Sequence, residues 1–442
     1  MDRVTTVEIG STITKVNGFR LDDGVFHHVA QGFAETTVDA GDVAVGARQA
    51  LRQAFGSPDR PAGEVFVNSS AAGGLRMSVH GLTSSMTARA AREAALGAGA
   101  IIVATTVGPM DEFDAAELRR ARPGIVLLAG GVDGGERRTV VDNAEVIASA
   151  RLGVPVVYAG NAAARGRVEA VLAAHDQPVV CVDNVFPDVD VLRVEPVRRL
   201  IHEVFNDHIT QAPGMAGLAR LSDHEVLPTP GAVLRATELF AEALGDALVV
   251  DVGGATTDVH SVTEGSAEWT ARSVEPEPRA KRTVEGDLGV FVNAARVAQM
   301  SGERPDSPRL AHLRAIPGDE RQAEVTRWLA GRAVEVGVAR HAGRVTTVFT
   351  PTGTTAVVRG KDLTAVRWVV GTGGALTRID GGAEILASVC TGAGDHLMPG
   401  PEARVLIDRD YRFSALGTLA GARPEAVRRT FAHWVEGAGA LR

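Results

Sequence analysis

The sequence lacks several features that mark common protein classes. Aromatic residues make up only 4% of the chain, and its two cysteines, Cys181 and Cys390, stand far apart. This spacing predicts two free buried thiols and argues against a disulfide framework. No apolar run approaches the roughly 18 residues that a membrane helix needs, and the start of the chain has no basic segment followed by an apolar one. We therefore expect a soluble, cytoplasmic protein that does not contact a membrane.

Two further binding classes are also disfavoured. The formal net charge is −8, whereas a nucleic-acid partner calls for a basic face. The chain has no H-E-x-x-H motif and no closely spaced cysteine pair, and the six-residue spacing of His202 and His208 does not place them on one helix face. The sequence therefore predicts neither nucleic-acid binding nor a catalytic zinc ion.

The size and pattern of the chain indicate an α/β protein. With 442 residues and 45% hydrophobic residues, it is long enough for two to four packed subdomains. Between residues 80 and 185, short apolar strands alternate with amphipathic helices. This alternation is typical of a parallel sheet with right-handed crossovers.

Residues 248–259 contain the most informative motif. An apolar run with the pattern of a buried strand ends at Asp251, and a glycine turn with two threonines follows. Such a turn lets backbone N–H groups approach phosphate oxygens, while Asp251 would supply a hard oxygen ligand for Mg²⁺. A plain structural turn is the alternative. The residues expected to bind phosphate here are Gly253, Gly254, Ala255, Thr256 and Thr257.

A second copy of this motif lies near the start of the chain. Residues 7–16 align without a gap on residues 250–259, so that Glu8 matches Asp251. Such self-similarity predicts two related halves, each with a phosphate-binding hairpin. Glu8 and Asp251 are the predicted metal ligands. The residues expected to bind phosphate in the first copy are Gly10, Ser11, Thr12, Thr14 and Lys15.

Two later glycine-containing turns complete the predicted site. The first follows another short apolar strand and is expected to lie under a nucleotide base or ribose; it comprises Gly371, Thr372, Gly373 and Gly374. The second carries Glu285 and Asp287 before a predicted helix over residues 290–297. With Asp251, these two carboxylates are the predicted catalytic residues, because they could orient a water molecule or a hydrated Mg²⁺ ion. N-capping of the helix by Asp287 is the structural alternative.

These motifs resemble those of the actin/Hsp70/sugar-kinase ATPase superfamily. More narrowly, the chain resembles the MutL-type glutamate mutase (methylaspartate mutase) accessory family, proteins thought to reactivate adenosylcobalamin-dependent mutases. The resemblance implies a duplicated ribonuclease H-like fold with an inserted α/β subdomain, bound ATP and Mg²⁺, and a mutase as protein partner. The matching stretches are residues 9–15, 69–75, 251–260, 281–289 and 371–376.

One position departs from the family pattern. The first hairpin of the family usually begins with Asp, and this chain has Glu8. A longer carboxylate can still hold a metal ion through water, so the resemblance implies that Glu8 is a functional substitute.

The predicted organisation has three parts. Residues 1–79 form the first half of the ATPase core, residues 80–230 form the inserted module that contacts the partner, and residues 231–442 form the second half. Within the insert, the loop of residues 130–136 is rich in glycine and acidic residues, and we expect it to be mobile.

Three functions are compatible with the sequence. The first is an ATPase that remodels a mutase so that damaged cobalamin leaves it. The second is a metabolite kinase, for which Asp251 or Asp287 could serve as the base. The third is a scaffold that keeps the fold without hydrolysing nucleotide. The sequence leaves the oligomeric state open.

Overall fold

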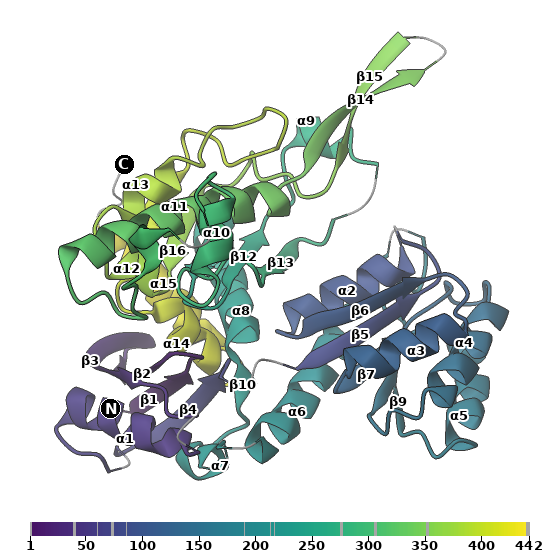
Figure 1. Ribbon diagram of the computed structural model, residues 1–442, viewed down its shortest axis with the longest axis horizontal. Helices are drawn as coiled ribbons and strands as arrows, with labels where there is room; N and C mark the ends of the chain where they lie inside the picture. Colours follow the sequence, from purple (N-terminus) through teal and green to yellow (C-terminus); the bar gives the residue numbers. More distant parts are fainter. Residues whose placement is uncertain are drawn as a thin grey trace. The chain divides into compact units, whose positions relative to one another are not determined.

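The computed structural model describes residues 2–38, 41–59, 61–71, 75–84, 86–189, 191–212, 214–215, 217–274, 277–304, 307–350 and 353–438. The chain divides into two compact units (Figure 1). The core unit contains residues 1–72 and 210–442, and the inserted unit contains residues 73–209. The residue boundaries 79/80 and 230/231 given above stay a prediction.

The core unit begins with a mixed five-stranded sheet. The central strand, β1 (Asp2–Ile9), pairs antiparallel with β2 (Ile13–Asp22), which pairs antiparallel with β3 (Val25–Glu35). On its other side β1 pairs parallel with β4 (Glu64–Ser69). Strand β10 then extends the parallel part beyond β4. In spatial order the strands are β3 (Val25–Glu35), β2 (Ile13–Asp22), β1 (Asp2–Ile9), β4 (Glu64–Ser69) and β10 (Leu227–Pro228).

The second sheet of the core unit repeats this topology strand for strand. It has the same two antiparallel pairings followed by two parallel pairings. In the matching order the strands are β13 (Ala280–Glu285), β12 (Thr257–Val262), β11 (Ala247–Val252), β16 (Trp368–Thr372) and β17 (Arg404–Ile407). This repeated order is the duplicated ribonuclease H-like fold of the actin/Hsp70/sugar-kinase class, so the predicted fold class is confirmed.

Both sheets share one hydrophobic core with helices that lie between them (Figure 1). Phe19 and Phe66 come from the first sheet and Val249 from the second, and all three pack with Phe240 and Phe413 of the helices. Burial of these large apolar side chains joins the two halves into one unit. The shared helices are α8 (Thr229–Leu244), α14 (Arg412–Leu419) and α15 (Pro424–Ala438).

The outer faces of the two sheets are covered separately. Helix α1 (Val43–Phe55) packs on β2 and β3, and Asp42 caps its N-terminus by accepting a hydrogen bond from the N–H of Ala44 at 2.8 Å. The second sheet buries its outer face under helices that line a core of small and branched residues. These are α10 (Ala294–Gln299), α11 (Glu320–His341), α12 (Gly374–Thr377) and α13 (Gly382–Ala387).

Helix α10 begins later than the sequence predicted. The N–H groups of Val290, Phe291 and Val292 do not enter a helix, because they donate to the carbonyls of Gly253 and Gly254 at 2.8–3.2 Å. Helix α10 starts at Ala294 with Asn293 as its N-cap residue. Asp287 is therefore not a helix cap, and the structural alternative given for it does not hold.

The remaining elements of the core unit are short or peripheral. A two-stranded ribbon projects from the unit (Figure 1). Cys181, in the inserted unit, and Cys390 are both free thiols, as predicted, but each is partly exposed and not fully buried. No helix in the described ranges is long and apolar enough to cross a membrane. The further elements here are α7 (Leu218–Leu221), α9 (Ala267–Thr270), the 3₁₀ turn η2 (Pro308–Leu310), and the ribbon strands β14 (Arg344–Thr350) and β15 (Gly353–Arg359).

The inserted unit is a parallel α/β sheet, as the alternation of strands and helices predicted. All of its strand pairings are parallel. In spatial order the strands are β6 (Ile101–Val107), β5 (Arg76–Gly81), β7 (Ile125–Leu128), β8 (Val156–Tyr158) and β9 (Val179–Cys181). The helices are α2 (Thr87–Gly97), α3 (Glu112–Ala121), α4 (Arg138–Ser149), the 3₁₀ turn η1 (Ala162–Ala164), α5 (Arg165–Ala173) and α6 (Glu195–Gln211).

The glycine-rich loop of residues 130–136 is held by hydrogen bonds from two asparagine side chains, and its expected mobility stays a prediction. The Asn161 amide group donates to the carbonyls of Gly135 and Glu136, and its oxygen accepts from the N–H of Gly134 at 3.2 Å. Asn184 donates to the carbonyl of Gly131 at 2.9 Å. Both asparagine side chains are buried, so the hydrogen bonds hold the loop backbone while the acidic side chains of Asp133 and Glu136 are exposed.

We expect the crossing of α8 and α14 to depend on Gly417. A Cβ atom at this position would lie 2.0 Å from the Ala232 carbonyl oxygen, so Gly417→Ala must push the two helices apart. This should lower the free energy of unfolding by about 1–3 kcal/mol, the usual range for overpacking. Urea unfolding measures it, with Gly421→Ala as the control because nothing lies within 4 Å of that position. Equal midpoints for the two variants would contradict the proposed close packing.

Candidate functional site

The two predicted hairpins have the same local geometry. In the first, the N–H of Gly10 donates to the carbonyl of Ile13 at 3.1 Å, and in the second the N–H of Gly253 donates to Thr256 at 2.9 Å. These bonds join equivalent positions of the gapless alignment. The hairpin tips also lie next to each other, because the Cβ position built on Gly254 falls 3.6 Å from two Thr12 side-chain atoms. The fold thus brings together two motifs that lie 243 positions apart in the sequence, counted from residue 7 to the matching residue 250.

The tip residues differ in their accessibility. Ser11 is exposed, and Gly10, Thr12 and residues 253–256 are partly exposed, so backbone and hydroxyl groups can meet a ligand. Thr14 and Thr257 are fully buried. The Thr14 hydroxyl lies 3.0 Å from that of Thr36, and the Thr257 hydroxyl donates to the Leu288 carbonyl at 2.8 Å. Thr14 and Thr257 were predicted to bind phosphate, but their buried hydroxyls instead bond to other residues of the protein.

In the first hairpin, the negative charge of Glu8 is balanced by the positive charge of Lys15. Glu8 lies opposite Lys15 in the β1–β2 register, and their side chains form an ion pair at 2.5 Å. The Ser414 hydroxyl donates to the second oxygen of Glu8, also at 2.5 Å. Burial alone would lower the pKa of Lys15, but Glu8, the Tyr411 side chain and Asp251 together raise it above its ordinary value. Lys15 is therefore a permanent cation at this end of the sheet.

The second hairpin has an acidic pair in the equivalent positions. Asp251 lies opposite Asp258, and Asp258 accepts two hydrogen bonds from the buried Arg282 at 2.8 and 2.5 Å. Among the described residues, no hydrogen bond or ion pair to the Asp251 carboxylate is seen. Burial raises the pKa of Asp251 to about 7 against the attraction of Lys15, and nearby carboxylates raise it further. Asp251 is therefore a carboxylate in need of a positive partner.

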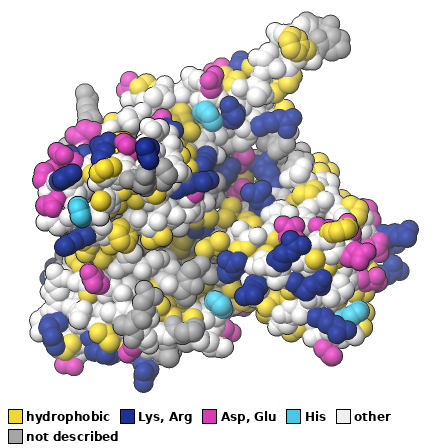
Figure 2. Space-filling view, in the orientation of Figure 1, with side chains coloured by type: hydrophobic (Ala, Val, Ile, Leu, Met, Phe, Trp, Pro, Cys, Tyr) yellow, Lys and Arg dark blue, Asp and Glu magenta, His cyan; other side chains and the backbone are white. Residues whose placement is uncertain are grey.

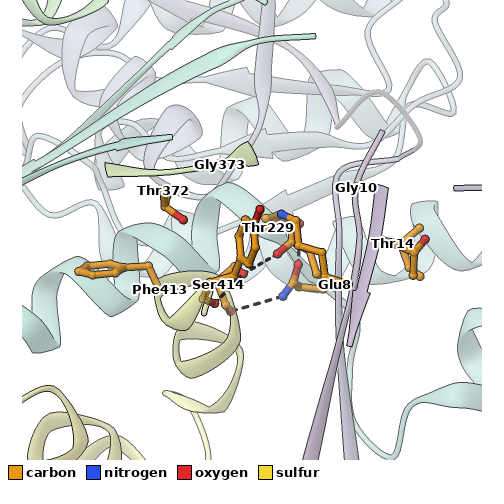
Figure 3. A network of polar contacts seen from close by, with 12 residues as sticks. Glu8, Gly10, Thr14, Thr229, Thr372, Gly373, Phe413 and Ser414 are labelled. Atoms are coloured by element: carbon orange, nitrogen blue, oxygen red, sulfur yellow. Dashed lines mark hydrogen bonds and ion pairs between the residues drawn. The ribbon is translucent and has the colours of Figure 1, made fainter. Parts of the chain in front are cut away.

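The third turn adjoins Asp251. Gly373 has a φ of +83°, and a Cβ atom there would come within 2.5 Å of an Asp251 carboxylate oxygen, so glycine is needed at this position. The preceding residue, Thr372, is buried and donates to Asp408 at 3.3 Å. Gly374 begins the short helix α12. Figure 3 shows Thr372 and Gly373 in the same region as Glu8 and Ser414.

Glu285 and Asp287 form a separate group with Arg340 of helix α11. The guanidinium donates to Glu285 at 2.5 Å and makes two bonds to Asp287 at 2.8 and 3.1 Å. Burial raises the pKa of Glu285 although Arg340 opposes this, while the hydrogen bond from Arg340 lowers the pKa of Asp287. The two predicted catalytic residues are thus brought together, but an arginine that the sequence reasoning had not selected holds both.

Sequence reasoning also missed several residues of the site. Asp408 is fully buried, accepts from the N–H groups of Arg412 and Phe413 at 2.7 and 3.0 Å, and has a pKa raised by burial to about 6. It follows the apolar strand β17 as Glu8 and Asp251 end their strands, so the same rule would have found it. No local pattern marks Ser414.

The carboxylates of this site fit a metal ion that takes most of its ligands from water and substrate and only one or two from the protein. No group of three His, Cys, Asp or Glu side chains able to hold a metal ion occurs within the described part of the chain. Both oxygens of Glu8 are already engaged, whereas Asp251 is uncompensated. Mg²⁺ commonly binds proteins through one or two carboxylates, with water and substrate phosphates completing its shell. Asp251 fits that kind of site.

The two sheets, their facing hairpins and the glycine turn define a protein of the actin/Hsp70/sugar-kinase fold class. The MutL protein family matches residues 4–435, and the chain belongs to this family. It is 33% identical over 458 residues to "Protein MutL" of Clostridium tetanomorphum, and the aligned region covers 97% of this chain and 98% of that protein. The resemblance to the glutamate mutase accessory family is thereby confirmed.

Two solved structures are similar along most of this chain. The nucleotide-free diol dehydratase-reactivating factor is 11% identical, with 96% of this chain and 100% of that chain covered and a TM-score of 0.35. Component A of the (R)-2-hydroxyglutaryl-CoA dehydratase of Acidaminococcus fermentans is 11% identical, with 96% and 99% covered and a TM-score of 0.31. The fold assignment rests on the strand order of the two sheets and not on these likenesses.

We expect Asp251→Asn to stabilise the protein at neutral and alkaline pH. Between pH 3.8 and about 7, folded Asp251 holds a proton that the unfolded chain has lost, so its contribution to stability falls as the pH rises through this window. Asparagine carries no such charge. At pH 8 the variant should gain on the order of 1–3 kcal/mol, and at pH 5 about a third of that gain. Thermal unfolding between pH 5 and 8 measures the difference, and a variant that loses stability at pH 8 would contradict this electrostatic description.

Proposed function

We propose that this protein is an ATP-binding and ATP-hydrolysing accessory factor that reactivates an adenosylcobalamin-dependent mutase such as glutamate mutase. The MutL family match along residues 4–435 carries this proposal. In such a factor, binding and hydrolysis of ATP change the relative stability of two conformations, and the partner responds to the change. Release of a damaged cobalamin from the mutase is the outcome that we propose. The cytoplasmic location stays a prediction of the sequence.

The proposed ATP phosphates lie between the two hairpins. Residues 10–12 and 253–256 offer accessible backbone and hydroxyl groups, and Lys15 supplies a positive charge. The turn of residues 371–374 supports the base or ribose. Asp251 would hold Mg²⁺, which would offset the charge of the phosphates. Glu285 and Asp287 orient the attacking water after Arg340 has released one of them.

The state of Asp251 supports a working site over an inert scaffold. A carboxylate that is raised to a pKa of about 7 and that has no hydrogen-bonding partner among the described residues weakens the fold. Such a cost is typical of a functional position, because a structural role alone gives no reason to keep the charge. No particular contact in the chain favours a metabolite kinase over an ATPase.

The inserted unit is the proposed contact surface for the mutase. Figure 2 shows apolar side chains among acidic and basic ones on this unit. Val107 is 48% exposed and Phe113 is 80% exposed, and they stand at the two ends of the short connection between β6 and α3. Exposed aromatic side chains are common anchors in protein interfaces.

The nucleotide part of the proposal is tested with Gly254→Ala. The added methyl group meets neighbours only at 3.5–3.6 Å, which is ordinary contact, so the variant should keep its melting temperature. The methyl group nevertheless points toward Thr12, where the phosphates are expected, and should weaken ATP binding by tenfold or more. Calorimetric titration with Mg–ATP measures this change. Unchanged affinity would place the phosphates elsewhere.

The partner part of the proposal is tested by pull-down from native lysate with and without ATP. We expect the wild-type protein to recover an adenosylcobalamin-dependent mutase in a nucleotide-dependent manner. Phe113→Ser should reduce that recovery several-fold with ATP turnover unchanged, because only an exposed contact is lost. Val29→Ser, which changes a residue of the core unit that is 55% exposed, is the control. If the mutase is not recovered by the wild-type protein, the proposed partner is wrong.

A further inference from the structure

Glu8 is engaged on both sides by residues from opposite ends of the chain. One carboxylate oxygen pairs with Lys15 at 2.5 Å, and the other accepts from Ser414 of helix α14 at 2.5 Å. Glu8 is 7% exposed and Ser414 is 5% exposed. Figure 3 shows the two side chains directed toward each other, with Thr14 apart from them. Two charge-assisted hydrogen bonds in a buried position fix the orientation of the carboxylate.

The segment that carries Ser414 also contacts Lys15 and the glycine turn. We call residues 408–414 the α14 clasp. The Lys15 ammonium lies 4.3 Å from the centre of the Tyr411 ring, and the Tyr411 hydroxyl accepts from Thr377, which follows the glycine turn, at 2.9 Å. Tyr411 has a φ of +54°, which is costly for an aromatic residue and typical of functional sites. The clasp therefore touches both the lysine and the turn.

We propose that Glu8 is a positioning residue for Lys15, and that Ser414 fixes Glu8 in this role, which leaves Asp251 as the carboxylate that serves the metal ion. This inference rests on the proposed ATPase function. It differs from the sequence expectation, in which Glu8 itself is a metal ligand. Lys15, held between Glu8 and the Tyr411 ring, then faces the phosphates as a fixed cation.

The length of the side chain explains why glutamate serves here. An aspartate at position 8 would end about 1.5 Å sooner, one carbon–carbon bond, and would lose the contact with Ser414. Among the described residues, no serine hydroxyl bonds to the equivalent Asp251, and Asp258 stands opposite it in place of a lysine. In this proposal the first hairpin therefore fixes the Lys15 ammonium, and the second hairpin binds Mg²⁺ through Asp251.

The contact is tested first in the nucleotide-free protein by a double-mutant cycle. Ser414→Ala and Glu8→Gln, alone and together, are unfolded in urea. We expect their effects on the unfolding equilibrium to be non-additive by a factor of five or more, because Ser414→Ala removes the donor and Glu8→Gln removes the charge that strengthens the same hydrogen bond. Thr430→Val is the matched control: its buried hydroxyl accepts from the N–H of Phe26, away from Glu8, so it should be additive with Glu8→Gln. Additive Ser414 and Glu8 variants would overturn the proposed contact.

The role is tested by binding of fluorescent mant-ATP at increasing Mg²⁺ concentration. Glu8→Gln and Ser414→Ala should weaken nucleotide binding about tenfold and threefold, with the Mg²⁺ midpoint within twofold of wild type. Ser414→Thr, which keeps the hydroxyl, should bind like wild type, and Asp251→Asn should shift the Mg²⁺ midpoint at least tenfold.

Two other results decide the remaining cases. If Glu8→Gln shifts the Mg²⁺ midpoint as much as Asp251→Asn does, Glu8 is a metal ligand and the inference is wrong. If the wild-type protein binds no mant-ATP, the proposed function fails, while the cycle in the nucleotide-free protein still reports on the contact between Glu8 and Ser414.

Discussion

The electrostatic arrangement at the ends of the two central strands is the constraint on which the site depends. Each strand ends in a carboxylate that the fold places near the other hairpin, so several negative charges come close together. Glu8 is neutralised by Lys15, and Asp258 by Arg282, whereas Asp251 keeps a pKa of about 7. The fold can hold this arrangement because two of these carboxylates, Glu8 and Asp258, are each paired with a cation.

The same arrangement explains how the two halves are joined. Helices α8, α14 and α15 share one apolar core with both sheets, and the crossing of α8 and α14 is close because Gly417 has no side chain. Helix α14 also carries Ser414, which reaches the first hairpin, and begins beside Asp408, which holds Thr372 of the second sheet. A movement of one sheet relative to the other would therefore change the contacts of both hairpins.

The second carboxylate group has a different character. Arg340 binds Glu285 and Asp287 together, so neither is free to act as a base in the present conformation. A bidentate arginine on half-buried carboxylates is a stable pairing. Among the described residues, Asp251 therefore has no ion pair, whereas Glu285 and Asp287 share one arginine.

The sequence by itself determined the strand-end carboxylates, the glycine turns and the gapless repeat of residues 7–16 in residues 250–259. It could do so because strand and turn patterns are local, and because duplication leaves matching residues in both halves. The N-cap of α1 at Asp42 is a local pattern of the same kind. The fold class followed because two such hairpins occur in few known architectures.

Only the tertiary structure decided which charges are paired. Ser414 meets Glu8 across 406 positions, and Arg340 meets Asp287 across 53, and neither distance leaves a periodic trace in the sequence. The delayed start of α10 and the hydrogen-bonded loop at residues 130–136 have the same origin, since backbone groups there bond to distant partners rather than to their neighbours. Local patterns fix where a carboxylate stands, but its partners come from elements that pack only when the chain has folded.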